Sequence, residues 1–295
     1  MSSLIIQPLA ANIMNAVFCG LMSFGLLLTP KQFMKGGQYQ SPWFKNIPDE
    51  SDNKLFYLGQ FMAFLMLGGC VVPTLLQPDS QFLCYQMTVI HALNLVHTLV
   101  FLLTSAYKNA VPDTSGGKGQ WYFGTVLNLV FFVVTLLASL HSTDNVVDSK
   151  ETYISKTVAN IVMLAFTSVF GLLFVTIPRV LLSMYWSDDA LEETKTCLGF
   201  KLLNMTDIER WWARCIGTVI LGLNLGVAID ANIEQPLYTA GSLVTMSTLT
   251  LLNFHQIIMR PYKSISFYHI KMSWIPNLLM CGVVIGVLSS ALLYV

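Results

Sequence analysis

The feature that most constrains this chain is a series of eight apolar segments, each about as long as a helix that crosses a bilayer. A transmembrane helix needs roughly 20 mostly apolar residues to span the hydrocarbon core. Within lipid the backbone must satisfy its own hydrogen bonds, so each segment is predicted to be a helix. The segments are residues 12–29, 55–76, 82–106, 121–140, 157–177, 211–229, 237–259 and 274–294.

The composition agrees with a polytopic membrane protein. Hydrophobic residues make up 54% of the 295-residue sequence and charged residues only 11%, whereas a typical soluble domain has about 25% charged residues. The mean hydropathy is +0.61. The formal net charge is zero, so nothing indicates a nucleic-acid partner. We therefore predict an all-α integral membrane protein with eight transmembrane helices.

The basic residues predict how the segments are oriented. Loops on the cytosolic, matrix or stromal side of a membrane carry an excess of Lys and Arg. Of the 16 basic residues, only Lys150 and Lys156 fall on the other side from the loops that follow the first, third, fifth and seventh segments. These odd-numbered loops are therefore predicted to lie on the inner side, with both termini on the outer or lumenal side. The sequence does not indicate which membrane or organelle.

The two halves of the chain share a pattern. Pro30 ends the first apolar segment and Pro178 ends the fifth, and a basic residue follows each proline. The same offset of 148 residues aligns Asn12 with Asn160. An offset of 155 residues aligns the second and third segments with the sixth and seventh, and an offset of 153 aligns the fourth with the eighth.

These offsets predict a duplicated four-helix unit, with the first copy in residues 1–145 and the second in residues 146–295. Four spans return a chain to its starting side, so the two copies have the same orientation. Parallel repeats of this kind are related by a pseudo-two-fold axis along the membrane normal.

Polar residues gather on the third and seventh segments, which are counterparts in the two halves. His91, Asn94 and Thr98 share one face of the third segment, because their spacing is i, i+3, i+7. The corresponding group on the seventh segment is Thr245, Thr248 and Asn253. These side chains either form hydrogen bonds between central helices or line a cavity for a lipid or small solute.

Two histidines raise the alternative of a cofactor. His97 and His255 lie at similar depths, and such a pair can ligate haem or magnesium pigments. Their positions in the two halves do not coincide, so we predict no cofactor; bound lipids or pigments fit better than haem. The hydrocarbon portions of the segments hold no Asp, Glu or Lys. Proton-coupled and sodium-coupled transporters usually need a buried carboxylate, so this composition disfavours them.

The inner side is predicted to carry the recognition surface. It holds all six tryptophans and the two longest loops, residues 31–54 and 179–210. Recognition surfaces are enriched in Trp, and long loops in compact domains are often functional. The residues predicted to contact a partner are Trp43, Trp186, Trp211 and Trp212.

These patterns together predict a non-enzymatic protein, because the sequence shows no nucleophile–base pair, phosphate-binding Gly-rich loop or metal-carboxylate cluster. The predicted function is a structural or accessory subunit of a larger membrane complex, with membrane lipids and other membrane-protein subunits as partners. The alternative is a transporter or channel for a small neutral solute or lipid, through a polar face between the third and seventh helices. A cavity at that face distinguishes the two.

Overall fold

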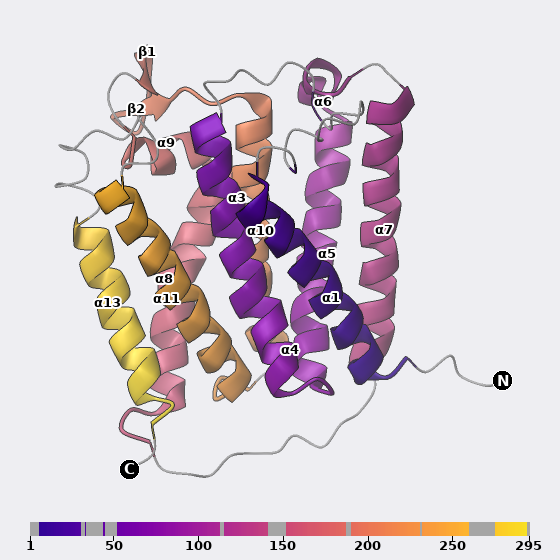
Figure 1. Cartoon of the computed structure of the whole chain (residues 1–295), viewed down its shortest axis with the longest axis vertical. Coiled ribbons are helices and arrows are strands. Elements are labelled where there is room, and N and C mark those ends of the chain that lie inside the picture. Colours follow the sequence, from indigo (N-terminus) through magenta and orange to yellow (C-terminus); the bar gives the residue numbers. More distant parts are fainter. Residues whose placement is uncertain are drawn as a thin grey trace.

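The computed structural model describes residues 6–30, 33, 44, 52–112, 115–140, 152–186, 190–230, 232–259 and 275–293. They form an upright bundle of long helices with a β-hairpin at one end (Figure 1). The first half of the chain contributes α1 (Pro8–Leu28), α3 (Asp52–Met66), the π-helical turn η2 (Leu67–Val71), α4 (Val72–Leu76), α5 (Gln81–Leu102), α6 (Ser105–Ala110) and α7 (Ser115–Ser139). The second half contributes α8 (Lys156–Thr176), α9 (Pro178–Ser183), β1 (Leu191–Cys197), β2 (Phe200–Leu203), α10 (Asp207–Asp230), α11 (Pro236–Met259) and α13 (Ile275–Ser290).

The helical membrane-type fold predicted from the sequence is confirmed. Six helical stretches of the described chain are long and apolar enough to cross a membrane: α1, the α3–η2–α4 stretch, α5, α7, α8 and α10. The helices α11 and α13 cover the seventh and eighth apolar segments. However, α11 is not among these six stretches, and α13 has only 16 residues. The full set of eight spans therefore stays a prediction.

The structure adds one element to the mostly helical fold that the sequence analysis did not predict. The loop after the fifth segment contains the antiparallel pair β1–β2, joined by Leu198 and Gly199. Both turn residues have positive φ, 54° and 80°. A two-residue hairpin turn of this kind matches the natural twist of the strands. Leu198 is a non-glycine residue in this backbone conformation, and 76% of its surface is exposed.

The second helical stretch also differs from a regular helix. The π-helical turn η2 lies just before Pro73, where the sequence is Leu-Gly-Gly-Cys-Val. Proline has no N–H, and its ring clashes with the carbonyl four residues earlier, which here belongs to Gly69. The wider turn separates these groups, and the Val72 N–H bonds to the Leu67 carbonyl instead.

Both prolines that follow α1 and α8 break the chain in the same way. Thr29, before Pro30, has φ −135° and ψ 51°; Ile177, before Pro178, has φ −132° and ψ 53°. The residue before a proline avoids the α conformation for steric reasons. In both places its N–H still bonds to the carbonyl four residues earlier, at 3.0 and 2.9 Å.

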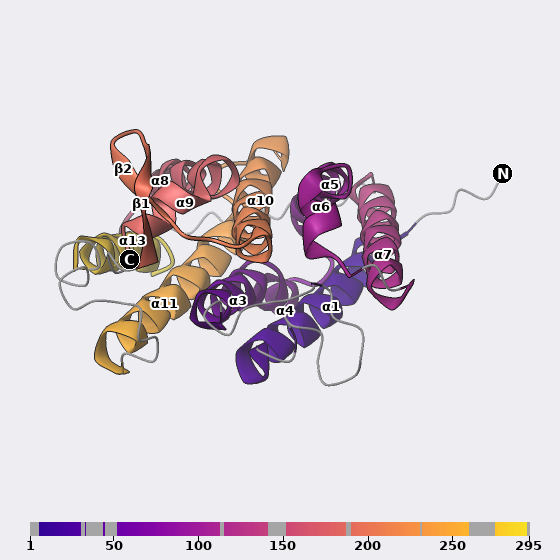
Figure 2. The same cartoon turned by 90° about the horizontal axis from the view of Figure 1, so that it is seen from above.

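The helices α3 and α10 form the centre of the bundle and pack against each other. The helix α10 also packs against α5 and α8, while the α3–η2–α4 stretch packs against α1 and α11. Figure 2 shows α5 and α11 on opposite sides of this central pair. The helices α7 and α13 lie outside α5 and α11 respectively, where each packs against its neighbour.

Glycines permit the closest helix contacts. Gly222 and Gly226 of α10 lie directly against α5, since a Cβ atom on either would come within 3.0 Å of α5 backbone atoms. Gly68 and Gly241 bring η2 equally close to α11. Small residues let membrane helices approach in this way.

Candidate ligand cavities

Two cavities lie within the bundle, one in each half of the chain. The first cavity has a volume of about 470 Å³ and is lined mainly by α1, α3, α5, α7 and α10. The second cavity has a volume of about 90 Å³ and is enclosed mainly by α3, α8, α10, α11 and α13. Each is therefore bounded by the long helices of one half together with the central helix of the other half.

The two cavities are lined by the same positions of the two halves. Residues of α1 in the first cavity and of α8 in the second differ by 148 residues, and residues of α5 and α11 differ by 155. The matching pairs include Phe18 and Phe166, Met22 and Phe170, Thr98 and Asn253, and Asn128 and Cys281.

His91 is one of the polar groups of the first cavity and is held between three helices. Its Nδ1 atom lies 2.7 Å from Asn128 Oδ1 on α7, and its Nε2 atom lies 2.8 Å from Asn15 Oδ1 on α1. The ring also stacks on Phe131, with centroids 5.3 Å apart. Both ring nitrogens have amide partners, so His91 ties α5 to its two neighbours.

The second cavity has a hydrogen-bond network centred on Asn224 of α10. Its Oδ1 atom accepts hydrogen bonds from the Tyr238 hydroxyl at 2.9 Å and the Thr167 hydroxyl at 3.0 Å. Its Nδ2 atom donates to the Ser168 hydroxyl at 2.9 Å. These contacts join α8, α10 and α11 and leave the rest of the wall mainly apolar.

One thin wall separates the cavities. Leu65, Gly69 and Leu223 line both of them. Gly69 belongs to the π-helical turn, and a Cβ atom at this position would come within 2.8 Å of a Leu223 methyl carbon. π-helical turns occur frequently at functional sites. The wall is thus formed by residues of the two central helical stretches.

Asn12 of α1 fixes the turn that precedes α5. This asparagine is 1% exposed, and its Nδ2 atom donates to the carbonyls of Pro78 at 2.9 Å and Ser80 at 2.8 Å. Its Oδ1 atom accepts from the Cys84 thiol at 3.3 Å. One side chain thereby satisfies two carbonyls outside the helices and a donor on α5.

Asn160 of α8 makes the same three contacts in the second half. Its Nδ2 atom donates to the carbonyls of Ile233 at 2.7 Å and Gln235 at 3.3 Å. Its Oδ1 atom accepts from the Thr239 hydroxyl at 2.8 Å. The three partners follow those of Asn12 by 155 residues.

The structure divides the predicted polar face between the two cavities. His91, Asn94 and Thr98 of α5 line the first cavity. Thr245 and Asn253 of α11 line the second. Thr248 lines neither, and its hydroxyl donates back to the Val244 and Thr245 carbonyls of its own helix. The helices α5 and α11 therefore do not enclose one shared polar face.

The predicted cofactor histidines lie in different environments. His97 stacks on the Trp211 ring with centroids 5.8 Å apart and lines a small pocket at the end of α5. His255 is exposed on α11 and lines neither cavity nor that pocket. Nothing in this arrangement places the two rings on one ligand.

The predicted partner-binding tryptophans are largely covered by the chain itself. Trp186 has no exposed surface and Trp212 is 9% exposed. Trp211 packs edge-on against Trp121 at 5.1 Å and Trp212 at 5.3 Å between ring centroids. Trp43 lies outside the described residues. The docking role of this group stays a prediction.

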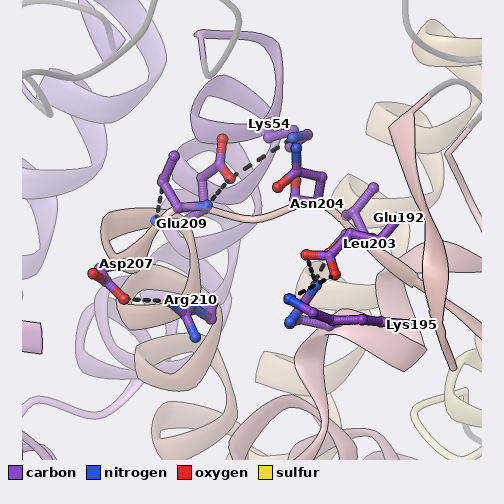
Figure 3. A network of polar contacts seen from close by, with 10 residues as sticks. Lys54, Glu192, Lys195, Leu203, Asn204, Asp207, Glu209 and Arg210 are labelled. Atoms are coloured by element: carbon purple, nitrogen blue, oxygen red, sulfur yellow. Dashed lines mark hydrogen bonds and ion pairs between the residues drawn. The ribbon is translucent and has the colours of Figure 1, made fainter. Parts of the chain in front are cut away.

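A buried carboxylate lies between α3 and α10 at the hairpin end of the bundle (Figure 3). Glu209 of α10 has no exposed surface. Its Oε2 atom accepts from the Thr206 N–H at 2.8 Å, and the Thr206 hydroxyl accepts from the Glu209 N–H at 3.4 Å, which is a capping box. Lys54 of α3 lies 3.8 Å from the same oxygen and also donates to the Asn204 carbonyl.

A second polar group fixes the hairpin to α9. Arg179 donates to the Leu203 carbonyl at 2.9 Å and pairs with Glu192, which also lies 3.3 Å from Lys195 (Figure 3). Desolvation raises the pKa of Glu192, but the Lys195 hydrogen bond and the Arg179 charge outweigh it and hold this pKa below its usual value.

Sequence reasoning missed the asparagines that complete these sites. Asn15 and Asn128 hold His91, and Asn224 organises the second cavity. The available signal was an amide side chain in the middle of an otherwise apolar segment, which usually needs a partner on another helix.

The described part of the chain thus forms a multi-pass α-helical membrane-type bundle with a cavity in each half. No protein-family model, curated protein or solved structure matches this chain. Its function is therefore argued from its own residues.

Proposed function

We propose that this chain spans the membrane eight times and consists of two copies of a four-helix unit. Three observations support the duplication. Asn12 and Asn160 make the same three hydrogen bonds, the backbone breaks alike before Pro30 and Pro178, and matching positions line the two cavities.

The packing supports a pseudo-two-fold axis between α3 and α10. These helices occupy the second place in their units and pack against each other. Each also packs against the third helix of the other unit, since α10 contacts α5 and the α3–η2 stretch contacts α11. Lys54 and Glu209, which are separated by the same offset of 155 residues, then face each other across this axis.

We propose that the hairpin end of the bundle faces the inner side of the membrane and that both termini face outward. The excess of basic residues in the odd-numbered loops supports this orientation. The hairpin, α6 and α9 lie at one end of the bundle, and the first turn of α1 and the last turn of α13 lie at the other (Figure 1).

Cys197 allows a direct test of the orientation. All six cysteines are free; Cys197, at the hairpin, is half-buried and the other five are buried. An impermeant maleimide is expected to label sealed vesicles at Cys197 only when it has access to the inner side, and a reporter fused after Val295 is expected outside. The Cys197→Ser variant is the control. Labelling of Cys197 from the outer side would reverse the proposed orientation.

We propose further that the protein is a non-enzymatic carrier of a small neutral solute or a lipid, which occupies these cavities. The observation that carries this proposal is the lining of the first cavity. Its wall is mostly apolar, with Asn94 and Thr98 beside the His91 group. No described residue with an Asp, Glu, Lys or Arg side chain lines either cavity. Ligand sites of this kind take mainly apolar molecules and orient them through a few polar groups.

A neutral diacylglycerol with a diazirine in one acyl chain tests this proposal. After photolysis in nanodiscs, we expect adducts on α1, α5 and α7 residues that line the first cavity. Met22→Trp should fill that cavity and weaken ligand binding by about 1.4 kcal/mol. This loss of binding free energy lowers the labelling of these residues about tenfold. The neighbouring Leu21→Trp variant is the matched control, because Leu21 is 68% exposed on the outside of α1.

The labelling pattern separates the alternatives. Adducts spread over the outer surface of the bundle, unchanged by Met22→Trp, would contradict a ligand in the first cavity. If the protein also migrates in one high-mass assembly and gives only this surface pattern of adducts, the structural-subunit function is favoured over the carrier function.

The hairpin favours the second candidate function. In this function the protein docks other membrane-protein subunits on the inner side. Leu198 and Phe200 at its tip are 76% and 48% exposed. A non-glycine residue with positive φ is uncommon, and such conformations concentrate at functional sites. Loss of the assembly in Leu198→Asp would favour this candidate.

A further inference from the structure

A basic pocket lies between the end of α5 and the start of α10. It has a volume of about 90 Å³, and its polar wall consists of His97, Thr104, Asp207, Arg210 and Arg214. Val100 and Phe101 complete the apolar side. The pocket is distinct from both cavities, because its charged residues line neither of them, although Trp211 borders this pocket and the first cavity.

Positive charge exceeds negative charge in this pocket. Arg210 pairs with Asp207 (Figure 3), but Arg214 has no hydrogen bond or ion pair to any described residue. The two arginines are four residues apart on one helix, an arrangement in which like charges repel. Arg210 also lies in the first turn of α10, where the helix dipole adds positive potential.

Several nitrogen atoms around the pocket lack partners. Arg210 Nε, His97 Nε2 and Trp211 Nε1 are buried and have no hydrogen-bond partner among the described residues. Buried donors are normally satisfied, so unsatisfied groups require an explanation such as a bound ion or ligand. An anion with several oxygen atoms would supply acceptors and compensate the arginine charges.

The position of the pocket indicates where such an anion comes from. Arg214 is exposed at the outside of the bundle, one to two turns inside the start of α10. Val100 lines the pocket and belongs to an apolar surface at the end of α5, where Leu99, Val100 and the C-cap residue Leu103 are 44%, 55% and 88% exposed. A phosphate held by the arginines would thus have an apolar surface beside it for acyl chains.

We propose that this pocket binds the phosphate head group of an anionic phospholipid. Basic pockets between transmembrane helices are suited to such head groups. Arg210 and Arg214 hold the phosphate, and the α5 surface holds the adjoining acyl chains. The equivalent place between α11 and α3 lacks these two charges, because Leu55 and Gly59 of α3 stand 155 residues before Arg210 and Arg214.

The test uses the full-length protein in nanodiscs of phosphatidylcholine that contain increasing fractions of phosphatidylglycerol. Native mass spectrometry counts the phosphatidylglycerol molecules that remain bound. We expect Arg214→Gln to weaken this binding about fivefold, and Arg210→Gln with Arg214→Gln about 25-fold, because each basic residue near the surface contributes about a factor of five. Lys201→Gln, which removes an exposed charge from the hairpin at the same end of the bundle, should leave binding unchanged.

The outcomes decide both the site and its ligand. Equal retention of phosphatidylglycerol by the wild type and the arginine variants would overturn the site. Saturation by millimolar inorganic phosphate, with loss of the phosphatidylglycerol preference, would show that the ligand is soluble phosphate and overturn the lipid. If the double variant does not fold in phosphatidylcholine alone, Arg214→Gln decides, because this exposed side chain has no hydrogen bond or ion pair to a described residue.

Discussion

Replacement of Gly226 by Leu is expected to destabilise the protein by about 3 kcal/mol or to prevent folding, and Gly222→Leu is expected to behave alike. A Cβ atom at Gly226 would lie 2.3 Å from Gln86 Cγ and 2.7 Å from Gln86 Cα. At Gly222 it would lie 2.5 Å from Ile90 Cγ1 and 2.9 Å from Ile90 Cα. Backbone atoms cannot move aside as a flexible side chain can, so α5 and α10 must separate.

Gly282→Leu and Gly286→Leu are the matched controls for this prediction. They belong to the same Gly-x-x-x-Gly pattern, but on α13 no atom of another described residue lies within 4 Å of either Cβ position. The free energy of unfolding of these variants should differ from that of the wild type by less than about 0.5 kcal/mol. Equilibrium unfolding in mixed micelles measures the difference. Equal effects at the two glycine pairs would show that α10 does not pack against α5 as described.

Replacement of Asn12 by Leu and of Asn160 by Leu should each destabilise the protein by about 2 kcal/mol. Each substitution removes three hydrogen bonds, and a hydrogen bond between membrane helices contributes about 0.6 kcal/mol. Each also leaves two carbonyls without their donor. Because the two asparagines have equivalent contacts, the two losses should agree within about 1 kcal/mol.

Smaller substitutions separate these contacts. Thr239→Val removes only the hydroxyl that donates to Asn160 and should cost about 0.6 kcal/mol. Thr88→Val is the control, because the Thr88 hydroxyl donates only to the Cys84 carbonyl of its own helix. A large loss for Asn12→Leu with none for Asn160→Leu would contradict the equivalence of the two units.

The sequence by itself predicted the helical membrane-type fold, and it alone supplies the offsets that relate the two halves. Apolar runs of this length leave the backbone no other partners in lipid, so their secondary structure follows from local composition. The proline breaks after α1 and α8 are equally local, because they depend on the ring of Pro30 or Pro178 and the residue before it. The offsets that aligned Asn12 with Asn160 likewise needed only the printed residues.

The tertiary structure alone decided which faces meet. Lipid-facing and buried residues of a membrane helix are both apolar, so hydropathy did not show whether Leu21 or Met22 points outward. The residue spacing on its own helix places His91 on a polar face, but its partners Asn15 and Asn128 come from two other helices. The division of α5 and α11 between two cavities has the same origin, because it depends on the packing of α3 against α10 rather than on any local pattern.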